Sequence, residues 1–364
     1  MKISVFDYSL RNFIKLCDYT FLFINEIKDN MRDVTLDNFK FILIALVVMG
    51  HAVEPLIEQF AWVNLTYIFI YLFHMPMFAY VSGAVSDPKL DDKAIYNLAT
   101  RLLIPYLILE VIYSVFDYVA FPGGALKITI LKPYWILWYL VSLILWRLLF
   151  SVFHRLKHPI FIAIVAGVMI GVTGFEYFLA LGRTFVFFPF FLIGYYKHND
   201  ILARLNGFQA RRYIGAAILL ISFGALLFYL NRYSIELPWL YGARSYSWLK
   251  ATIYEGAIIR TSLYVIAALL GISVLAVTSD KSRFFTSYGK HTLPIYIFHG
   301  LILKSILALG FYDYINSDLE ALTVFILALF LLPILSSHIA RLVMRIVTNP
   351  FSYVSSWKNR RPQA

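Results

Sequence analysis

Apolar runs long enough to cross a lipid bilayer recur through most of this sequence, and they constrain its fold more than any other feature. The first begins near Leu36 and the last ends near residue 342. Each is close to the roughly 20 residues that a transmembrane helix needs. The composition agrees, because 60% of the residues are hydrophobic and only 15% are charged. We predict an all-α, polytopic membrane protein.

Ten spans are predicted, at residues 36–57, 65–84, 101–121, 134–153, 159–174, 184–197, 213–231, 257–278, 292–310 and 320–342. The span at 184–197 is short enough for a half-helix. If both termini are cytosolic, the cytosolic segments hold 23 of the 32 Lys and Arg residues and the outer loops hold seven. This asymmetry follows the positive-inside rule. The net charge of +11 is therefore explained by topology and does not indicate nucleic-acid binding.

The predicted membrane domain covers residues 36–343 and is flanked by two basic segments. Residues 1–35 mix apolar and basic residues at roughly helical spacing, which indicates an interfacial helix on the inner leaflet or a disordered leader. Residues 344–364 form a basic cytosolic tail. A single cysteine, Cys17, excludes an internal disulfide and a thiolate metal site. No metal-ligand spacing is present, so no metal site is predicted.

The first span carries a histidine deep in its apolar sequence. Lys40 and His51 are eleven residues apart, almost three helical turns, so they share one face about 16 Å apart along the axis. Asp37 lies about one turn before Lys40. Glu54 follows His51 at i+3, where a carboxylate orients an imidazole that acts as a general base. The alternative is a histidine satisfied by a neighbouring helix, with Glu54 exposed at the outer interface.

Six further side chains are candidates for a binding or catalytic role, namely His74, Arg101, Trp138, Arg147, Arg183 and His299. His74 either reaches a cavity or bonds a carbonyl group that a kink at Pro76 sets free. Arg101 either snorkels to the inner headgroups or binds an anion such as phosphate. Trp138 also suits packing or an interfacial anchor. Arg147, Arg183 and His299 lie in or beside apolar segments, where ionisable groups are costly.

The same stretches resemble, in order, the landmarks of the membrane-bound acyltransferase-3 family, most of all its fucose 4-O-acetylase-like branch. The matching segments are Asp37-Asn38…Lys40…Gly50-His51, Phe73-His74-Met75-Pro76…Ser82-Gly83, Arg101-Leu102-Leu103-Ile104-Pro105-Tyr106, Trp138-Tyr139-Leu140…Trp146-Arg147, Pro189-Phe190-Phe191…Gly194-Tyr195 and Tyr288-Gly289…Tyr296…His299. Two positions depart from the family pattern. Lys40 stands where the family commonly has arginine, and Arg101 stands alone where the family has paired arginines.

The resemblance implies a ten-helix enzyme that moves an acyl group, usually acetyl from acetyl-CoA, onto a hydroxyl of a saccharide or lipid-linked glycan. We expect a multi-pass protein of the plasma (inner) membrane, with acetyl-CoA as co-substrate and no permanently bound cofactor. In this hypothesis His51 is the base and Glu54 its partner, while Lys40, Arg101 and Arg147 bind the donor.

Two other functions are weighed against this one. A proton-coupled transporter would use His51, Glu54 and Arg147 as a relay, but such proteins typically contain inverted repeats, and none is visible here. A scaffold for glycan assembly would tolerate the loss of His51.

The topology gives a first testable prediction. In a Cys17→Ser background, single cysteines near Asn199 and Lys281 should be labelled from the cytosolic side, and those near Pro122 and Pro238 from outside, because the basic residues fix this orientation. The measurement is labelling by a membrane-impermeant thiol reagent in intact and permeabilised cells. An odd number of spans, or an external C-terminus, would contradict the prediction.

Overall fold

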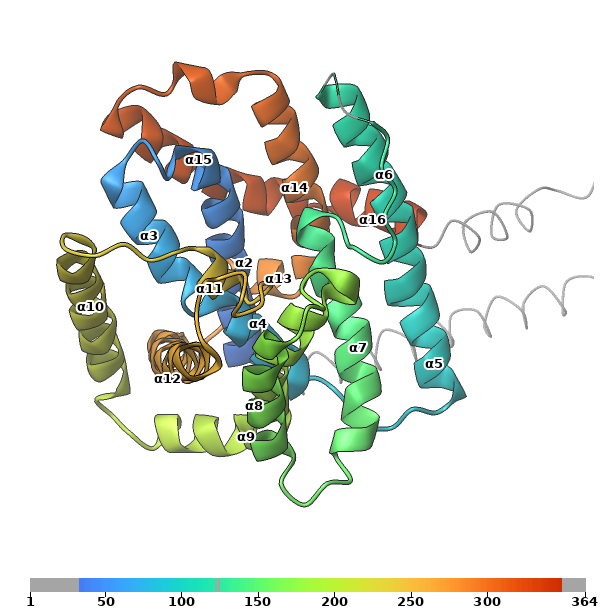
Figure 1. Ribbon diagram of the computed structural model, residues 1–364, viewed down its shortest axis with the longest axis vertical. Coiled ribbons are helices and arrows are strands. Elements are labelled where there is room, and N and C mark those ends of the chain that lie inside the picture. Colours follow the sequence, from blue (N-terminus) through green and yellow to red (C-terminus); the bar gives the residue numbers. More distant parts are fainter. Residues whose placement is uncertain (1–32, 122, 124, 349–364) are drawn as a thin grey trace, which may run out of the picture.

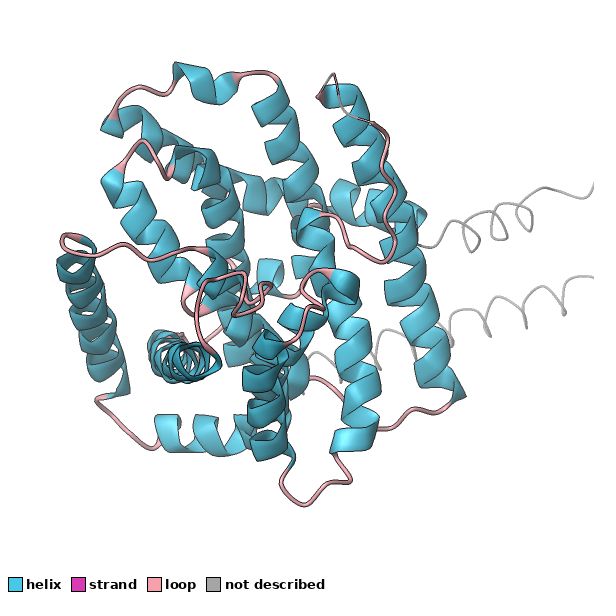
Figure 2. Cartoon of the chain, viewed as in Figure 1, coloured by secondary structure: helices cyan, strands magenta, loops and turns pink. Residues whose placement is uncertain are grey.

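The computed structural model describes residues 33–121, 123 and 125–348 of the chain (Figure 1). The regular structure of these residues is helical, and none of them forms a β-strand (Figure 2). The predicted all-α fold is confirmed. Most of the predicted N-terminal segment, and most of the basic tail, lies outside the described residues.

Eight helices of the described residues are long and apolar enough to cross a membrane, and two shorter apolar helices accompany them. The eight are Val34–Leu56, Ala61–Ala84, Asp92–Ala120, Trp135–Phe153, Phe178–Asn206, Arg211–Leu230, Ile253–Val277 and Asp318–Leu335. The shorter pair is Pro159–Val172 and Thr292–Ala308. Each of the ten predicted spans overlaps one of these segments. The protein is therefore a multi-pass, α-helical membrane protein.

Short 3-10 or π turns join or interrupt many of the helices. In chain order the elements are α2 (Val34–Val53), η1 (Glu54–Leu56), α3 (Ala61–Tyr71), α4 (His74–Ala84), α5 (Asp92–Leu98), η2 (Ala99–Leu103), α6 (Ile104–Ala120), η3 (Trp135–Leu137), α7 (Trp138–Phe153), α8 (Pro159–Met169), η4 (Ile170–Val172), η5 (Phe178–Ala180), α9 (Leu181–Asn206), α10 (Arg211–Leu230), α11 (Pro238–Tyr241), α12 (Ile253–Val277), α13 (Thr286–Gly289), α14 (Thr292–Ala308), η6 (Phe311–Tyr314), α15 (Asp318–Leu335) and α16 (His338–Thr348).

The helix at the sixth predicted span is longer than the sequence indicated. α9 has 26 residues and continues through Pro189 and the polar residues 197–206 before it ends at Gly207. A hydropathy pattern detects only the apolar part of a helix, so it missed the polar last turns. α9 is therefore a full span and not a half-helix. The tenth predicted span is shorter than expected, because α15 ends at Leu335 and α16 begins as a separate helix at His338.

Proline residues explain two irregularities. The second span is broken between α3 and α4, where Phe73 leaves helical geometry with φ −137°. Pro76 follows three residues later, and it lacks the N–H that would bond the Leu72 carbonyl. Similarly, Pro105 has no N–H for the carbonyl of Arg101, and the ladder widens there into the single π turn η2.

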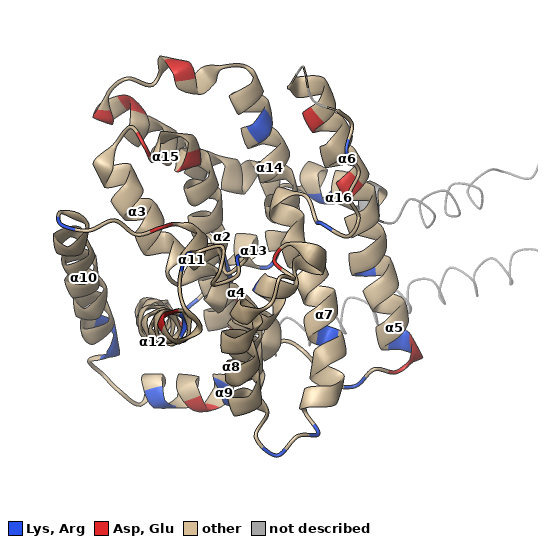
Figure 3. Ribbon diagram, viewed as in Figure 1, with Lys and Arg blue, Asp and Glu red and all other residues tan. Residues whose placement is uncertain are grey.

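The interior of the bundle is formed by three spans. They are the first (α2), the second (α3 and α4) and the sixth (α9). In their most apolar windows 61%, 67% and 61% of the residues are buried, against 11% for α10 and 28% for α15. Figure 1 agrees, with α2 and α4 near the centre and α10 at the edge. Apolar residues exposed on α10 and α15 fit a lipid-facing surface. Basic residues lie at the end of α9 and the start of α10, and acidic residues lie at the start of α15 (Figure 3).

α4 and α9 approach each other so closely that their backbones touch at two glycines. A Cβ atom added at Gly83 would overlap the backbone oxygen of Phe191, and one added at Gly194 would overlap that of Tyr80. Small residues allow this approach in membrane helices. The contact holds α4, which begins with His74, against α9.

The substitution Gly83→Val should lower the apparent Tm of the detergent-purified protein by several degrees. Overpacking typically costs about 1–3 kcal/mol, and here the obstacle is backbone, which cannot rotate away. The matched control is Gly224→Val on α10, where an added Cβ meets nothing within 4 Å. Both variants should be melted at one heating rate. Equal Tm values for the two would contradict the close approach of α4 and α9.

Candidate active site

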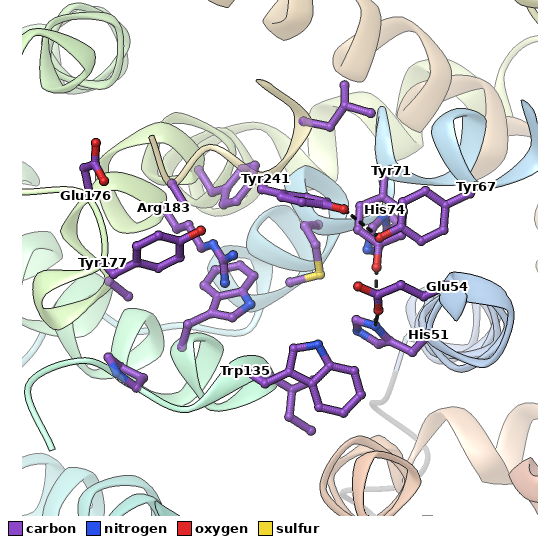
Figure 4. Close-up of a pocket in the computed structure, with 18 residues that line it drawn as sticks. His51, Glu54, Tyr67, Tyr71, His74, Trp135, Glu176, Tyr177, Arg183 and Tyr241 are labelled. Atoms are coloured by element: carbon purple, nitrogen blue, oxygen red, sulfur yellow. Dashed lines mark hydrogen bonds and ion pairs between the residues drawn. The ribbon is translucent and has the colours of Figure 1, made fainter. Parts of the chain in front are cut away.

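His51, in the last turn of α2, lines a cavity of about 290 Å³ (Figure 4). The walls come from helix ends and from the segments that join helices. The lining residues are His51, Glu54, Tyr67, Tyr71, His74, Met75, Pro133, Trp135, Ile136, Trp138, Glu176, Tyr177, Ala180, Arg183, Phe187, Leu240, Tyr241 and Ala243. The cavity thus contains five of the residues predicted from the sequence.

The imidazole of His51 is held by two polar groups at the same nitrogen. Nδ1 lies 3.1 Å from Oε2 of Glu54 and 3.3 Å from the hydroxyl of Tyr71. An ionised carboxylate only accepts hydrogen bonds, so Nδ1 carries a proton and donates it to Glu54. Nε2 is then the basic nitrogen of the neutral ring, and no described residue bonds it. The expected i+3 contact between His51 and Glu54 is present.

The ring of His51 also contacts other rings that the fold brings to it. It stacks on His299 of α14 with centroids 5.5 Å apart and meets the edge of Trp135 at 4.9 Å. His299 is fully buried, and its Nδ1 donates to the Ile295 carbonyl at 3.0 Å. Its Nε2 is buried without a hydrogen-bond partner among the described residues. The predicted candidate His299 is therefore a direct neighbour of His51.

His74 lines the cavity, which is one of the two roles that the sequence left open. Its Nδ1 donates to the carbonyl of Ile70 at 2.8 Å, next to the break between α3 and α4, and not to the Leu72 carbonyl that Pro76 leaves without an N–H partner. This bond fixes the ring against Tyr71, whose centroid is 4.5 Å away. The side chain is buried.

A cluster of tyrosines forms the wall beside His51. Tyr67 and Tyr71 stack with ring centroids 3.9 Å apart, and the hydroxyls of Tyr67 and Tyr241 are 3.0 Å apart. Sequence reasoning did not select these residues. The i, i+4 spacing of Tyr67 and Tyr71, with His74 three residues further, was the available signal for a polar face on the second span. Nothing local to Tyr241 indicated that it joins them.

A second cavity of about 410 Å³ meets the first at His51, Glu54 and Trp135. Its other lining residues are Pro55, Leu303, Lys304, Leu307 and Tyr312. This chamber is mainly apolar. Its cation, Lys304, lies 3.6 Å from Asp117 and near the rings of Trp135 and Tyr134. His51 therefore stands where two chambers of different character join.

The far wall of the first cavity carries Arg183, in the first turn of α9. Its guanidinium carbon lies 4.8 Å from the ring centre of Trp138 and 5.7 Å from that of Tyr177. Both Arg183 and Trp138 were predicted candidates, and they face the same cavity.

Glu176, on the same wall, is held from the loop that follows α11. Its carboxylate accepts hydrogen bonds from Arg244 at 2.7 Å and from the hydroxyl of Ser245 at 2.9 Å. Burial acts to raise the pKa of Glu176, but the bonds from Arg244 and Ser245 outweigh it and leave this pKa below its ordinary value. Glu176 therefore fastens two segments that line the cavity.

Backbone strain is concentrated at the cavity. Trp135, Leu179 and Ala180 have positive φ angles of 30°, 47° and 53°, which residues with a side chain rarely adopt. Trp135 and Ala180 line the cavity, and Leu179 directly precedes Ala180. Strain of this kind tends to cluster at functional sites.

The predicted donor-binding residues do not reach the cavity. Lys40 forms an ion pair of 2.5 Å with Asp37 near the start of α2, at the end opposite His51. Arg101 is exposed in η2. Arg147 lies on α7 nine residues beyond Trp138, about 13 Å along the helix. The structure therefore does not assemble the three-residue relay of a transporter, because Arg147 is not in the cavity of His51 and Glu54.

Comparison with known proteins decides the family. A family profile for the acyltransferase domain, Acyl_transf_3, matches residues 33–341. The chain belongs to the acyltransferase-3 family. This match covers every described wall of the cavity, so the cavity lies within the domain that defines the family. In the part of the chain that the structure describes, no group of three or more His, Cys, Asp or Glu residues could hold a metal ion.

Two curated relatives of this chain have the name nodulation protein NolL. The protein from Mesorhizobium japonicum is 30% identical over 222 residues, which cover 56% of this chain and 57% of the relative. The protein from Sinorhizobium fredii is 29% identical over 192 residues, covering 49% and 52%. The chain spans about half the length of the curated relatives it matches. No solved structure matches it.

The contacts of Glu176 predict a pH-dependent contribution to the stability of this acyltransferase. A carboxylate whose pKa is lowered by folding stabilises the fold above its unfolded pKa, about 4.3 for glutamate, and loses this effect as the pH falls through the lowered value. Glu176→Gln should therefore lower the Tm near pH 7, by the equivalent of about 1 kcal/mol after allowance for solvent screening. The difference from wild type should shrink below about pH 4.

The matched control for this experiment is Glu236→Gln, because Glu236 is exposed and lies in the same outer region of the chain. Tm values of the detergent-purified proteins should be compared from pH 3.5 to 7. A Tm difference that is absent at neutral pH, or that grows as the pH falls, would contradict the role given to Glu176.

Proposed function

We propose that this protein transfers an acetyl group from acetyl-CoA to a hydroxyl group of a saccharide or envelope glycan, with His51 as general base. The observation that carries the proposal is the pairing of His51 Nδ1 with Glu54 at 3.1 Å beside a cavity. The family supplies the reaction class, acyl transfer. The donor, the acceptor and the roles of the residues are the proposed part.

The reaction follows from the tautomer of His51. Nδ1–H donates to Glu54, which leaves Nε2 to take the proton of an acceptor hydroxyl as its oxygen attacks the thioester carbonyl carbon. The tetrahedral intermediate then breaks the carbon–sulfur bond and forms the ester. The imidazolium returns the proton to the thiolate, so CoA leaves as the thiol. Glu54 stabilises the imidazolium between these two proton transfers. This one-step transfer needs no serine or cysteine nucleophile.

The lining of the first cavity suits a sugar. Tyr71, Trp135 and Trp138 offer apolar ring faces, while Tyr67 and Tyr241 offer hydroxyl groups. Aromatic residues with a polar atom can cover the C–H face of a saccharide and bond its hydroxyls. A volume of about 290 Å³ is near the lower end of the range for small-ligand pockets. The acceptor in this proposal is held with one hydroxyl at Nε2 of His51.

Donor binding is proposed at the opposite, basic end of α2. Lys40, Arg101 and Arg147 are the candidates for the CoA phosphates, because guanidinium and ammonium groups pair with phosphate oxygens. Acetyl-CoA is cytosolic, and the positive-inside rule assigns this end to the cytosol. The thioester arm would then extend along α2 toward His51, about 16 Å from Lys40. The corresponding location is the plasma (inner) membrane.

His51→Ala should lower kcat by about 10²–10⁴-fold, the usual contribution of a general base. Glu54→Gln should have a smaller effect, and the double variant should be little worse than His51→Ala, because the two residues act as one unit. The measurement is transfer of radiolabelled acetyl from acetyl-CoA to extracted envelope glycans by detergent-purified protein. CoA binding should persist in all variants.

The matched control is His158→Ala, which removes an exposed histidine ahead of α8. Its turnover should equal that of wild type. Size-exclusion profiles check that each variant is folded. Near-normal turnover in folded His51→Ala would remove the histidine from the mechanism. A double variant whose loss is the product of the two single losses would remove Glu54 as its partner.

A further inference from the structure

Arg183 stands out among the charged groups around the first cavity. It projects from the start of α9, and Figure 4 shows it across the drawn pocket from His51. The rings of Trp138 and Tyr177 lie 4.8 and 5.7 Å from its guanidinium carbon. These cation–π contacts fix the position of the charge without neutralising it.

No carboxylate or hydrogen-bond acceptor of the described residues pairs with Arg183, and its Nε is buried without a partner. The neighbouring cations are different. Arg244 lies 2.7 Å from Glu176, and Lys304 lies 3.6 Å from Asp117. Arg183 is half-buried, and leaving its guanidinium without an acceptor is unfavourable, so an arginine kept in this state at the wall of a cavity points to an anion that it meets there.

The carboxylates of the cavity leave the charge of Arg183 unpaired. Glu176 is engaged by Arg244 and Ser245, and Glu54, which accepts a hydrogen bond from His51, lies with His51 across the pocket from Arg183 (Figure 4). The unpaired charge on the Arg183 wall is therefore positive. A planar guanidinium favours carboxylate and phosphate groups, because two of its N–H groups can bond two oxygens at once.

We propose that Arg183 binds the anionic group of an acidic saccharide, so that the acceptor is a sugar bearing a carboxylate or phosphate. This inference rests on the proposed function. The acceptor carries the anion because Arg183 lines the same cavity as His51, whereas none of the proposed donor cations Lys40, Arg101 and Arg147 lines it. The sugar thus spans the cavity, with its anion at Arg183 and its reacting hydroxyl at His51. Arg183 is a specificity-determining residue.

The test compares methyl glucuronoside with methyl glucoside, which differ at one carbon that is a carboxylate in the first and a hydroxymethyl group in the second. Wild-type protein in detergent should transfer acetyl to the glucuronoside with the higher kcat/KM. Arg183→Gln should raise the KM for the glucuronoside about tenfold or more, because one partner of a buried charge pair is lost. The KM for the glucoside should change less than about twofold.

Arg183→Lys keeps the charge but not the fork of donors, and it should restore part of the preference. The matched control is Arg232→Gln, since Arg232 also rests on a ring, that of Phe228 at 4.0 Å, but is exposed at the end of α10. It should retain the wild-type preference. Size-exclusion profiles and Tm values check the fold of each variant.

A second readout does not depend on catalysis. Titration of wild-type protein with methyl glucuronoside, without donor, should change tryptophan fluorescence, because Trp138 lies against Arg183. Arg183→Gln should abolish the change at the same concentrations. If fluorescence responds but no acetyl is transferred to any acceptor, the proposed function fails while the anion site stands.

Three results would overturn the inference. One is equal binding and transfer of the two glycosides by wild type. Another is an Arg183→Gln variant that loses binding and transfer equally for the glucuronoside and the glucoside. The third is a rise in the KM for acetyl-CoA, with that for the glucuronoside unchanged, which would assign the anion to the donor.

Discussion

The contact between His51 and Glu54 depends on a constraint that shapes the rest of the protein. An ionisable ring at the end of an apolar helix is tolerated only if polar groups and a cavity surround it. Glu54 lies at the same end of α2, three residues after His51. Tyr71 and the stacked His299 come from α3 and α14, so helices distant in sequence must converge on one point. This convergence explains why α2 lies among the most buried spans of the bundle.

The departures from regular helical geometry lie beside the cavity, where helices distant in sequence meet around His51. The break after Tyr71, opposite Pro76, lets α3 and α4 follow different directions, so that Tyr71 and His74 both line the cavity. Positive φ angles at Trp135 and Ala180 bring the segments before α7 and α9 to the same wall. These features cost free energy locally. The close packing of α4 on α9 fixes the position of α4 beside the cavity, because the two backbones touch at Gly83 and Gly194.

The position of His51 between two chambers bears on how two substrates meet. A direct transfer needs a hydroxyl and a thioester to approach one base from different directions. One chamber is aromatic and polar, and it holds Arg183. The other is mainly apolar, with Lys304 at its wall. Lys40, paired with Asp37, lies outside both chambers, almost three helical turns along α2 from His51. The proposed reaction therefore joins groups that are held apart until they reach His51.

The sequence by itself determined the all-α membrane fold and the approximate place of ten apolar helices, eight of which are long enough to span a bilayer, because the length of an apolar run is a local property of the sequence. It predicted the contact of His51 with Glu54 as one of two alternatives, since residues at i and i+3 share a helical face, and the structure selected that alternative. The sequence did not predict where α9 and α15 end. Polar residues can extend or interrupt a helix without changing the length of its apolar run. Only the tertiary structure brought Tyr241 and Glu176 to the cavity and left Arg147 outside it. Those contacts join segments remote in the chain, and no local pattern records which distant helix faces will pack together.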